Sequence, residues 1–190
     1  MITDFQESQI SGHILIKDDM GNVVLDKKNA IHIENMSLAL AQSLGNKPLG
    51  PIEKIAFGNG GSTVSGVGTV TYLQPNVIGA SASLYNKTFE KIVDNLNVAN
   101  PDPERNRMDV SHVTGNLFSD LIITSNLDFG EPSSQDALDN ANSVEDDFVF
   151  DEIGLFNYDN KLVTHVIFSP VQKSLNRSFV INYTLRIQPV

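Results

Sequence analysis

Residues 148–187, FVFDEIGLFNYDNKLVTHVIFSPVQKSLNRSFVINYTLRI, predict three consecutive β-strands. Every second residue at the start of the first strand is expected on one face: Phe148, Phe150 and Glu152. The turn-forming segment 158–161 (YDNK) separates this strand from the second, so the two strands are predicted to form a hairpin.

The remainder of this stretch predicts where the second strand ends and how the third one packs. Ser169-Pro170 is expected to end the second strand, because proline has no N–H to donate to a β-ladder. The third strand places alternate apolar residues on one face: Phe179, Ile181, Tyr183, Leu185 and Ile187. Three such strands, with no nucleophile, metal cluster or phosphate loop among them, are typical of a β-sandwich or barrel.

The rest of the chain adds strands and one helix. A hairpin is predicted over 10–28, and further strands at 52–57, 108–113 and 117–127. Residues 86–98 alternate only loosely and favour a strand, with a helix as the alternative. The single helix is predicted at 34–44, with an apolar stripe formed by Ile33, Met36, Leu40 and Leu44. We therefore predict a mainly β, antiparallel sandwich or barrel-like fold with one short helix near the N-terminus and long loops. A single β-rich domain, 10–190, follows an N-terminal arm, 1–9.

Two loop excursions interrupt this pattern. Residues 58–68 (GNGGSTVSGVG) are rich in glycine but lack the lysine of a phosphate-binding P-loop. Thr63 occupies the place of the third glycine of a dinucleotide fingerprint, so we interpret this segment as a flexible loop that joins two β elements. Residues 130–147 are rich in Pro, Ser, Asn and Asp, and loops of this length are often functional or disordered.

Composition excludes several classes of site. The 190 residues contain no cysteine, so disulfides and thiolate metal sites are excluded. The net charge of −10 argues against nucleic-acid binding, which needs clustered Lys and Arg, and favours a surface that keeps the protein soluble. The chain shows no signal peptide and no apolar run long enough to span a bilayer. We expect a soluble protein that is made in the cytoplasm and does not act at a membrane.

Titratable residues give no catalytic or metal-binding pattern. The four histidines are scattered without HxH or HExxH spacing, and His13 and His165 lie within strand patterns. The acidic run 145–147 lacks the spacing of an EF-hand. Glu152, between Phe150 and a glycine, is expected to be partly buried and hydrogen-bonded to turn amides. We expect no enzyme activity, no metal and no cofactor.

Three segments, in this order, carry a family resemblance: 55–60 (IAFGNG), 84–87 (LYNK) and 151–156 (DEIGLF). They resemble the virion-attachment domain at the head of tail-collar fibres in contractile-tailed bacteriophages. The segments 162–163 (LV), 170–173 (PVQK) and 182–187 (NYTLRI) follow as in that family, and the resemblance covers roughly residues 52–187. The chain departs from the family in two ways: it stops at Val190, soon after the last strand, and it carries an extra hairpin and helix at 10–45.

The resemblance implies a non-enzymatic structural component of a bacteriophage virion, free-standing and not itself a fibre. We expect it in the tail, baseplate or neck-collar region, as an assembly or fibre-attachment adaptor and a homo-oligomer that contacts other virion proteins. A capsid decoration protein and a carbohydrate-binding β-sandwich that contacts the host surface are the alternatives. Contact surfaces are expected at the N-terminal arm and at the two loop excursions. The candidate interface residues in these excursions are Gly58, Asn59, Gly60, Gly61, Glu131, Pro132, Glu145, Asp146 and Asp147.

Overall fold

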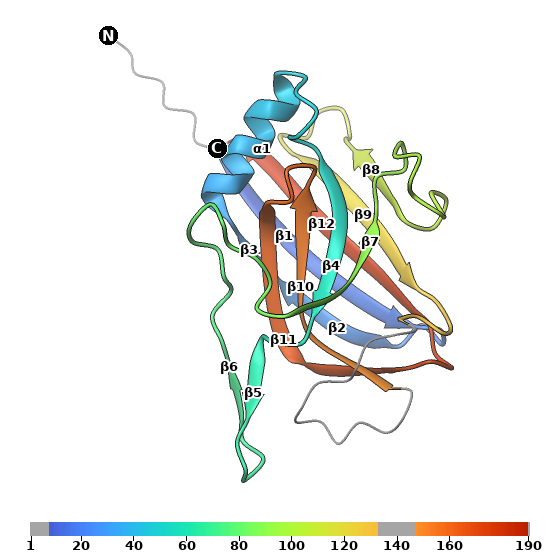
Figure 1. Ribbon diagram of the computed structural model, residues 1–190. Helices are drawn as coiled ribbons and strands as arrows, with labels where there is room; N and C mark the ends of the chain where they lie inside the picture. Colours follow the sequence, from blue (N-terminus) through green and yellow to red (C-terminus); the bar gives the residue numbers. More distant parts are fainter. Residues whose placement is uncertain (1–7, 133–146, 190) are drawn as a thin grey trace.

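The protein is built from two five-stranded antiparallel sheets that pack face to face, as the computed structural model in Figure 1 shows. The structure describes residues 8–132 and 147–189. In spatial order, the first sheet contains β2 (Val23–Lys28), β1 (Ser8–Asp18), β12 (Phe179–Pro189), β9 (Ser119–Leu127) and β8 (Arg107–Ser111). The second contains β3 (Ala30–Ile31), β11 (Leu162–Ser174), β10 (Asp147–Asn157), β4 (Ile52–Gly58) and β7 (Lys87–Ile92). The predicted mainly β fold is confirmed as a sandwich.

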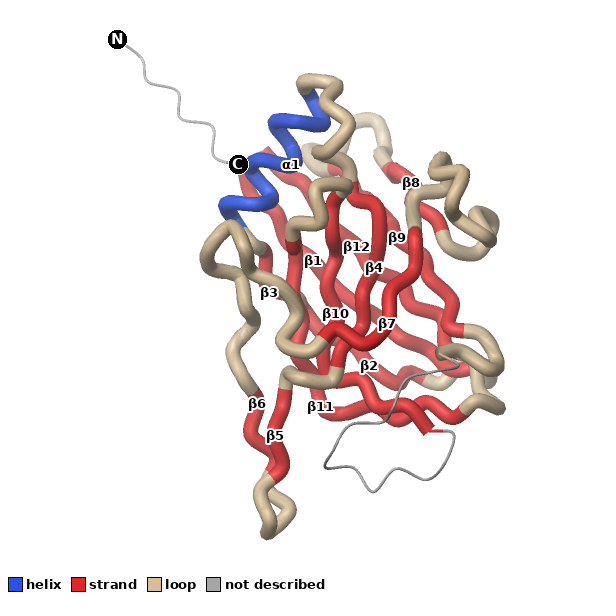
Figure 2. The backbone as a smooth tube through the Cα atoms, viewed as in Figure 1, coloured by secondary structure: helices blue, strands red, loops and turns tan. Residues whose placement is uncertain are grey.

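Two smaller elements complete the described part of the chain. A separate pair of short strands, β5 (Ser62–Val64) and β6 (Val70–Tyr72), forms a hairpin outside both sheets. The helix α1 (Ile33–Leu44) lies over one end of the sandwich, and Figure 2 shows how strands dominate the rest. Within residues 8–132 and 147–189, no helix is long and apolar enough to cross a bilayer.

The core follows from alternation in the strands. The predicted face of β12 is confirmed from Phe179 to Leu185, because Phe179, Ile181, Tyr183 and Leu185 are buried while the residues between them are only partly covered. Ile187, near the end of the strand, is only half-buried. Each fully buried side chain of this size stabilises the fold by roughly 1.5–3 kcal/mol. In β10 and β11 both faces are buried. The inner face belongs to the core between the sheets, and Leu84 from the loop after β6 covers the outer face.

Tyr183 joins the two sheets through its hydroxyl group. The hydroxyl donates to Oγ1 of Thr164 in the opposite sheet over 2.7 Å and accepts from Nδ2 of Asn29 over 2.6 Å. Complete burial raises the pKa of Tyr183 far above its ordinary value, because the phenolate form would be desolvated. The tyrosine therefore acts as a neutral hydrogen-bonding bridge across the core.

The helix α1 differs from expectation in how its apolar stripe is used. It begins after His32, whose Nδ1 accepts a hydrogen bond from the Asn35 N–H. Met36 is buried, but Ile33 and Leu44 at the two ends are 80% and 89% exposed. The prediction of one packed stripe is therefore wrong at both ends, because the helix covers only the open end of the sandwich.

Three further predictions need correction. The strand β11 does not end at Ser169-Pro170. It continues to Ser174, because the ladder with β10 is interrupted there and the proline faces no partner that needs its N–H. The same interruption places Phe150 and Glu152 on opposite faces of β10, although they are two residues apart. Residues 58–68 are not simply a flexible loop, since they contain β5 and the turn toward β6.

Candidate functional site

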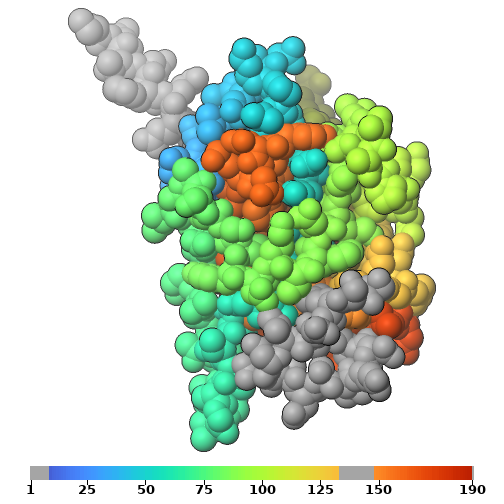
Figure 3. Space-filling model, viewed as in Figure 1, coloured from blue at the N-terminus to red at the C-terminus, as the bar shows by residue number. Residues whose placement is uncertain are grey.

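The β5–β6 hairpin, residues 62–72, projects from the sandwich at the end opposite α1 (Figure 1). The space-filling view in Figure 3 shows it extending beyond the rest of the surface. Its strands pair Ser62 with Tyr72 and Val64 with Val70. The N–H of Ser65 donates to the Thr69 carbonyl over 2.9 Å and closes the turn. We call residues 62–72 the projecting hairpin.

Asp151 of β10 holds the base of the projecting hairpin. Its Oδ1 accepts from the Gly61 N–H over 2.8 Å. Its Oδ2 accepts from the Ser62 N–H over 2.7 Å and from the Ser62 hydroxyl over 2.6 Å. The N–H of Leu73 donates to the Gly61 carbonyl and completes the base. A two-stranded hairpin is only marginally stable alone, so these bonds fix its position on the sandwich.

Glu152, the next residue, binds two loops at once. Its Oε1 accepts from the N–H groups of Gly60 over 3.1 Å and Asn86 over 2.8 Å. Its Oε2 accepts from the Tyr85 N–H and from Nε2 of His165, both over 2.9 Å. All four donors are protein groups, so this buried carboxylate is fully hydrogen-bonded and satisfies three backbone amides outside the sheets.

The interruption in the β10–β11 ladder allows the carboxylates of two adjacent residues, Asp151 and Glu152, to bind the same backbone segment. Adjacent residues of a regular strand point to opposite faces. Here Phe150 pairs with Val171 and Glu152 pairs with Ile167, so Asp151 lies at the irregularity between them. Asp151 and Glu152 both reach the backbone between Gly60 and Ser62 as a result.

Close approach explains two glycines at the base of the hairpin. A Cβ atom on Gly58 would lie 2.5 Å from both the Asn86 carbonyl oxygen and Glu152 Oε1. A Cβ atom on Gly60 would lie 2.7 Å from the Asn86 nitrogen and 2.8 Å from Cβ of Tyr85. Side chains at these positions would push the 85–86 segment away from the carboxylate.

The two carboxyl groups have opposite pKa shifts. Burial acts to raise the pKa of Glu152, but hydrogen bonds from His165 and from the Asn86 and Tyr85 amides outweigh it and hold the pKa below its ordinary value. Burial raises the pKa of Asp151 above its ordinary value; bonds from Ser62 and Gly61 offset only part of this, and the neighbouring Glu152 charge adds to it.

His165 is fixed in one tautomer by its two partners. Its Nδ1 accepts a hydrogen bond from the Asn76 N–H over 2.8 Å, so the ring proton lies on Nε2 and is donated to Glu152. The ring also packs beside Tyr85, with centroids 5.9 Å apart. His165 thereby attaches a third backbone segment, around Asn76, to Glu152.

This arrangement is suited to holding loops in place. Asp151, Glu152 and His165 are 2%, 0% and 0% exposed, and their polar atoms face backbone amides or one another. A substrate could reach them only after the attached loops had moved away. Among the described residues, no group of three or more His, Asp or Glu side chains is arranged to hold a metal ion.

The segment that includes the projecting hairpin carries no charge. Residues 55–86 contain no Asp, Glu, Lys, Arg or His, although charged residues make up 19% of the chain. Several apolar side chains of this segment are exposed: Val67, Val70, Tyr72, Leu73 and Ile78. An uncharged, partly apolar projection on an acidic protein is typical of a contact surface.

The first four candidate interface residues, 58–61, lie at the base of the projecting hairpin and are not exposed. Gly58 and Gly61 are buried, and Asn59 and Gly60 are half-buried at the base of the hairpin. The exposed part of this excursion begins at Thr63. The four residues therefore position the projecting hairpin and do not themselves form its outer surface.

The second group of candidates belongs to a turn held by two lysines. Glu131 is half-buried and accepts from Lys91 Nζ over 2.6 Å, and Pro132 is buried. Nζ of Lys173, which has no exposed surface, donates to the carbonyls of Asp128 and Glu131. Burial lowers the pKa of Lys173.

Several predicted contact residues lie at or beyond the limits of the described chain. Glu145 and Asp146 lie outside the described residues, as does most of the 130–147 excursion. Asp147 is the first residue of β10 and pairs with Ser174. The structure describes only Ser8 and Gln9 of the N-terminal arm, and both belong to β1.

Sequence reasoning anticipated the burial of Glu152 and its hydrogen bonds to loop amides, but it did not identify which amides donate or the bond from His165. Tyr85 is 67 residues from Glu152, whereas His165 lies 13 residues away on the next strand of the hairpin, and no local pattern connects either of them with the carboxylate. Lys173 was missed because a lysine after a polar bend is typically exposed. The uncharged segment 55–86 could have indicated a contact surface, since its lack of charge is visible in the sequence alone.

Comparison of the chain with protein-family models, with curated proteins and with solved structures gives no match.

Proposed function

We propose that this protein is a non-enzymatic structural component of a bacteriophage virion that works by docking through its projecting hairpin. The observation that carries the proposal is the hairpin itself, which is uncharged, exposed and fixed at its base by Asp151 and Glu152. The tail, baseplate or neck-collar region is the proposed location, the role is that of an assembly or fibre-attachment adaptor, and capsid decoration is the alternative. Its partners are other virion proteins and further copies of the chain.

The arrangement of the three resembling segments supports this assignment. Segments 55–60, 84–87 and 151–156 are far apart in sequence but meet at Glu152. Its carboxylate binds the amides of Gly60, Tyr85 and Asn86. Glycines at 58 and 60 are needed for the same contact. The resemblance therefore involves residues that form one physical unit, which is the base of the projecting hairpin.

The chemistry of the buried cluster supports a structural role over a catalytic one. Acid–base catalysis needs a carboxyl group within hydrogen-bond reach of a substrate. Asp151 and Glu152 have shifted pKa values, as catalytic pairs often do, but their oxygens are occupied by backbone N–H groups of the loops that they hold.

A genetic complementation experiment tests the proposal. The gene is deleted from the genome that encodes it, and the particles released are purified and viewed by negative-stain microscopy. We expect particles that lack a tail or collar part, with rescue by the wild-type chain. A chain in which residues 63–71 are replaced by Asn-Gly should fail to rescue, and Gly66→Ala should rescue. Complete, infectious particles from the deletion strain would overturn the proposal.

A host-surface carbohydrate-binding module is the second candidate. The rings of Tyr72 and Tyr85 are both 45% exposed near the hairpin, and aromatic faces stack on sugars. A glycan array probed with the purified chain distinguishes the two functions. Binding that is lost in Tyr72→Ala would favour this candidate, and a blank array would remove it.

A further inference from the structure

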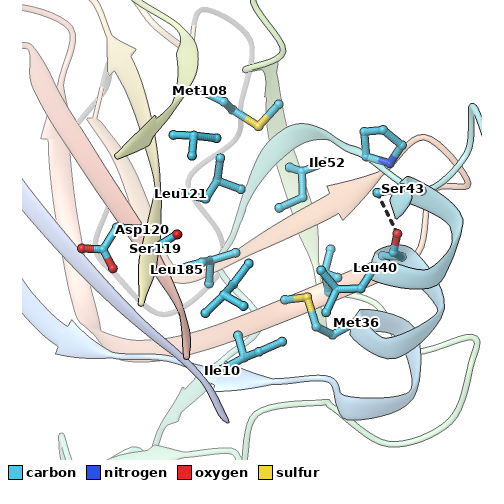
Figure 4. A pocket seen from close by; sticks show the side chains of 16 residues that line it. Ile10, Met36, Leu40, Ser43, Ile52, Met108, Ser119, Asp120, Leu121 and Leu185 are labelled. Atoms are coloured by element: carbon cyan, nitrogen blue, oxygen red, sulfur yellow. Dashed lines mark hydrogen bonds between the residues drawn. The ribbon is translucent and has the colours of Figure 1, made fainter. Parts of the chain in front are cut away.

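An apolar cavity of about 320 Å³ opens at the end of the sandwich that carries α1. Figure 4 shows side chains from both sheets and from α1 pointing into it. Its apolar lining includes Met36, Leu40, Ile52, Met108, Val110 and Leu185. Protein interiors are normally close-packed, so an open apolar space of this size is a place where a ligand or partner can bind. We call it the α1 cavity.

The α1 cavity carries no free charge. Asp120 is the one ionisable residue among those that line it, and its carboxylate is paired with the Arg186 guanidinium over 2.8 Å. Figure 4 shows the Asp120 carboxylate turned away from the apolar side chains around Leu121 and Leu185. The cavity is therefore suited to an uncharged, apolar group. Its rim includes Val110, which is 77% exposed.

We propose that the tip of the projecting hairpin of one copy inserts into the α1 cavity of the next copy. The inference rests on the proposed structural function and names the partner surface for the hairpin. Each copy would use its hairpin on one neighbour and its cavity on another, which is a head-to-tail contact. Such contacts produce a closed ring when the rotation closes and an open filament when it does not.

The lack of free charge on both surfaces allows a second copy to be the occupant. The chain has a net charge of −10, and its charged residues all lie outside 55–86, so two acidic bodies repel each other. The hairpin carries no charge and the α1 cavity no unpaired charge, and both present exposed apolar groups. A contact between them joins two copies without placing acidic surfaces against each other.

Position and size also fit. The hairpin and α1 lie at opposite ends of the molecule (Figure 1), so one copy can use both surfaces at once. Val67, at the tip, is 89% exposed. The cavity is about twice the ~150 Å³ that accommodates a benzene-sized group, so it has room for the Val67 side chain. The bonds from Asp151 and Glu152 fix the base of the hairpin, and the Ser65–Thr69 bond closes its turn, which reduces the entropy lost on association.

Two single substitutions at exposed positions test the contact. Val67→Glu places a charge on the tip, and Val110→Glu places one at the cavity rim. Each should convert wild-type assemblies into monomers, measured as light-scattering mass at equal concentration. Ile78→Glu is the matched control, because Ile78 is 88% exposed in the same uncharged segment but outside the hairpin. The control should assemble like the wild type.

A mixture of the two variants distinguishes head-to-tail contact from any symmetric one. Val67→Glu retains an intact cavity and Val110→Glu retains an intact tip, so the mixture should give dimers and nothing larger. The chain has no cysteine, so Val67→Cys combined with Val110→Cys should form intermolecular disulfides and a covalent ladder on oxidation.

Three results would overturn the head-to-tail contact: assemblies that persist in both glutamate variants, a mixture that stays monomeric, or a wild-type chain that stays monomeric at every concentration. Persistent assemblies would leave the proposed structural function standing, because copies would then meet through another surface. Failure of the proposed function itself is read separately, from the complementation experiment.

Discussion

Glu152 and His165 lie on adjacent strands and share a 2.9 Å hydrogen bond, with no exposed surface on either side chain. The pair is the point where two loops outside the sheets are attached: the loop after β4 through the Gly60 amide, and the loop between β6 and β7 through the amides of Tyr85 and Asn76. The position of the projecting hairpin therefore depends on groups buried in the second sheet. Substitution of Glu152 or His165 should therefore alter the mobility of the exposed hairpin.

Removal of the imidazole should destabilise the protein. His165→Ala leaves Glu152 without one of its four donors and the Asn76 N–H without its acceptor. We expect the free energy of unfolding to fall by about 3 kcal/mol. Urea denaturation measures this. His13→Ala is the control, because His13 bonds Asp26 in an exposed pair and its loss should cost less than ~1 kcal/mol. Equal effects of the two substitutions would contradict the role of His165.

Asp151 and Glu152 should protect different backbone amides from hydrogen exchange. Glu152→Gln should accelerate hydrogen exchange either at Gly60 and Asn86 or at Tyr85, because an amide NH₂ group replaces one of the two acceptor oxygens. Asp151→Asn should accelerate exchange at Gly61 and Ser62 instead. Exchange measured residue by residue by NMR separates the two patterns. The same pattern in both variants would show that the two carboxylates do not bind separate sets of amides.

Acid should weaken the contribution of Glu152. Its pKa in the folded protein lies below its ordinary value, so the ionised form stabilises the fold above pH ~4.3 and this stabilisation is lost as the pH falls through the lower, folded value. The difference in unfolding free energy between wild type and Glu152→Gln should shrink over that range. Curves that remain parallel below pH 4 would contradict this assignment.

The ionised form of Asp151 should destabilise the fold, in contrast to that of Glu152. Burial raises its pKa, so the folded protein binds the proton more tightly than the unfolded chain does. The destabilising effect of the ionised group is present above the raised pKa and disappears as the pH falls toward ~3.9. The cost of Asp151→Asn relative to wild type should therefore increase as the pH falls through this range. A cost that decreases toward acid pH would refute the raised pKa.

A methyl group at position 60 should displace the 85–86 segment. Gly60→Ala places Cβ 2.7 Å from the Asn86 nitrogen, and we expect a loss of about 1–3 kcal/mol in unfolding free energy, together with faster proteolysis of the hairpin. Gly66→Ala is the matched control, because its Cβ would meet nothing within 4 Å. A neutral Gly60→Ala would show that the loop can adjust without cost.

Local alternation made much of the fold predictable. The apolar face of β12, the β1–β2 hairpin and the β10–β11 hairpin all follow from residues that are close in sequence. The course of β11 past Pro170 was not predictable in this way. It depends on an interruption of the ladder with β10, which is a property of two strands together. The exposed ends of α1 were missed because the sequence does not show how much sheet lies beneath a helix.

The candidate site was predictable only in part, for a similar reason. The position of Glu152 between Phe150 and Gly154 indicated burial, and the burial is complete. The backbone amides that bind it are more than 60 residues away, whereas His165 is 13 residues away on the adjacent strand. The hairpin that it positions contains two short strands where the sequence predicts a flexible loop. Short strands of Val, Thr and Ser between glycines give little periodicity, because each contains only three residues.

The most direct test of the central claim is the light-scattering mass of the wild-type chain over a range of concentrations, beside the chain in which residues 63–71 are replaced by Asn-Gly. The account predicts wild-type assemblies visible by negative-stain microscopy, and a hairpin-replaced chain that stays monomeric with an unchanged thermal unfolding midpoint. Equal masses for the two chains at every concentration would contradict it.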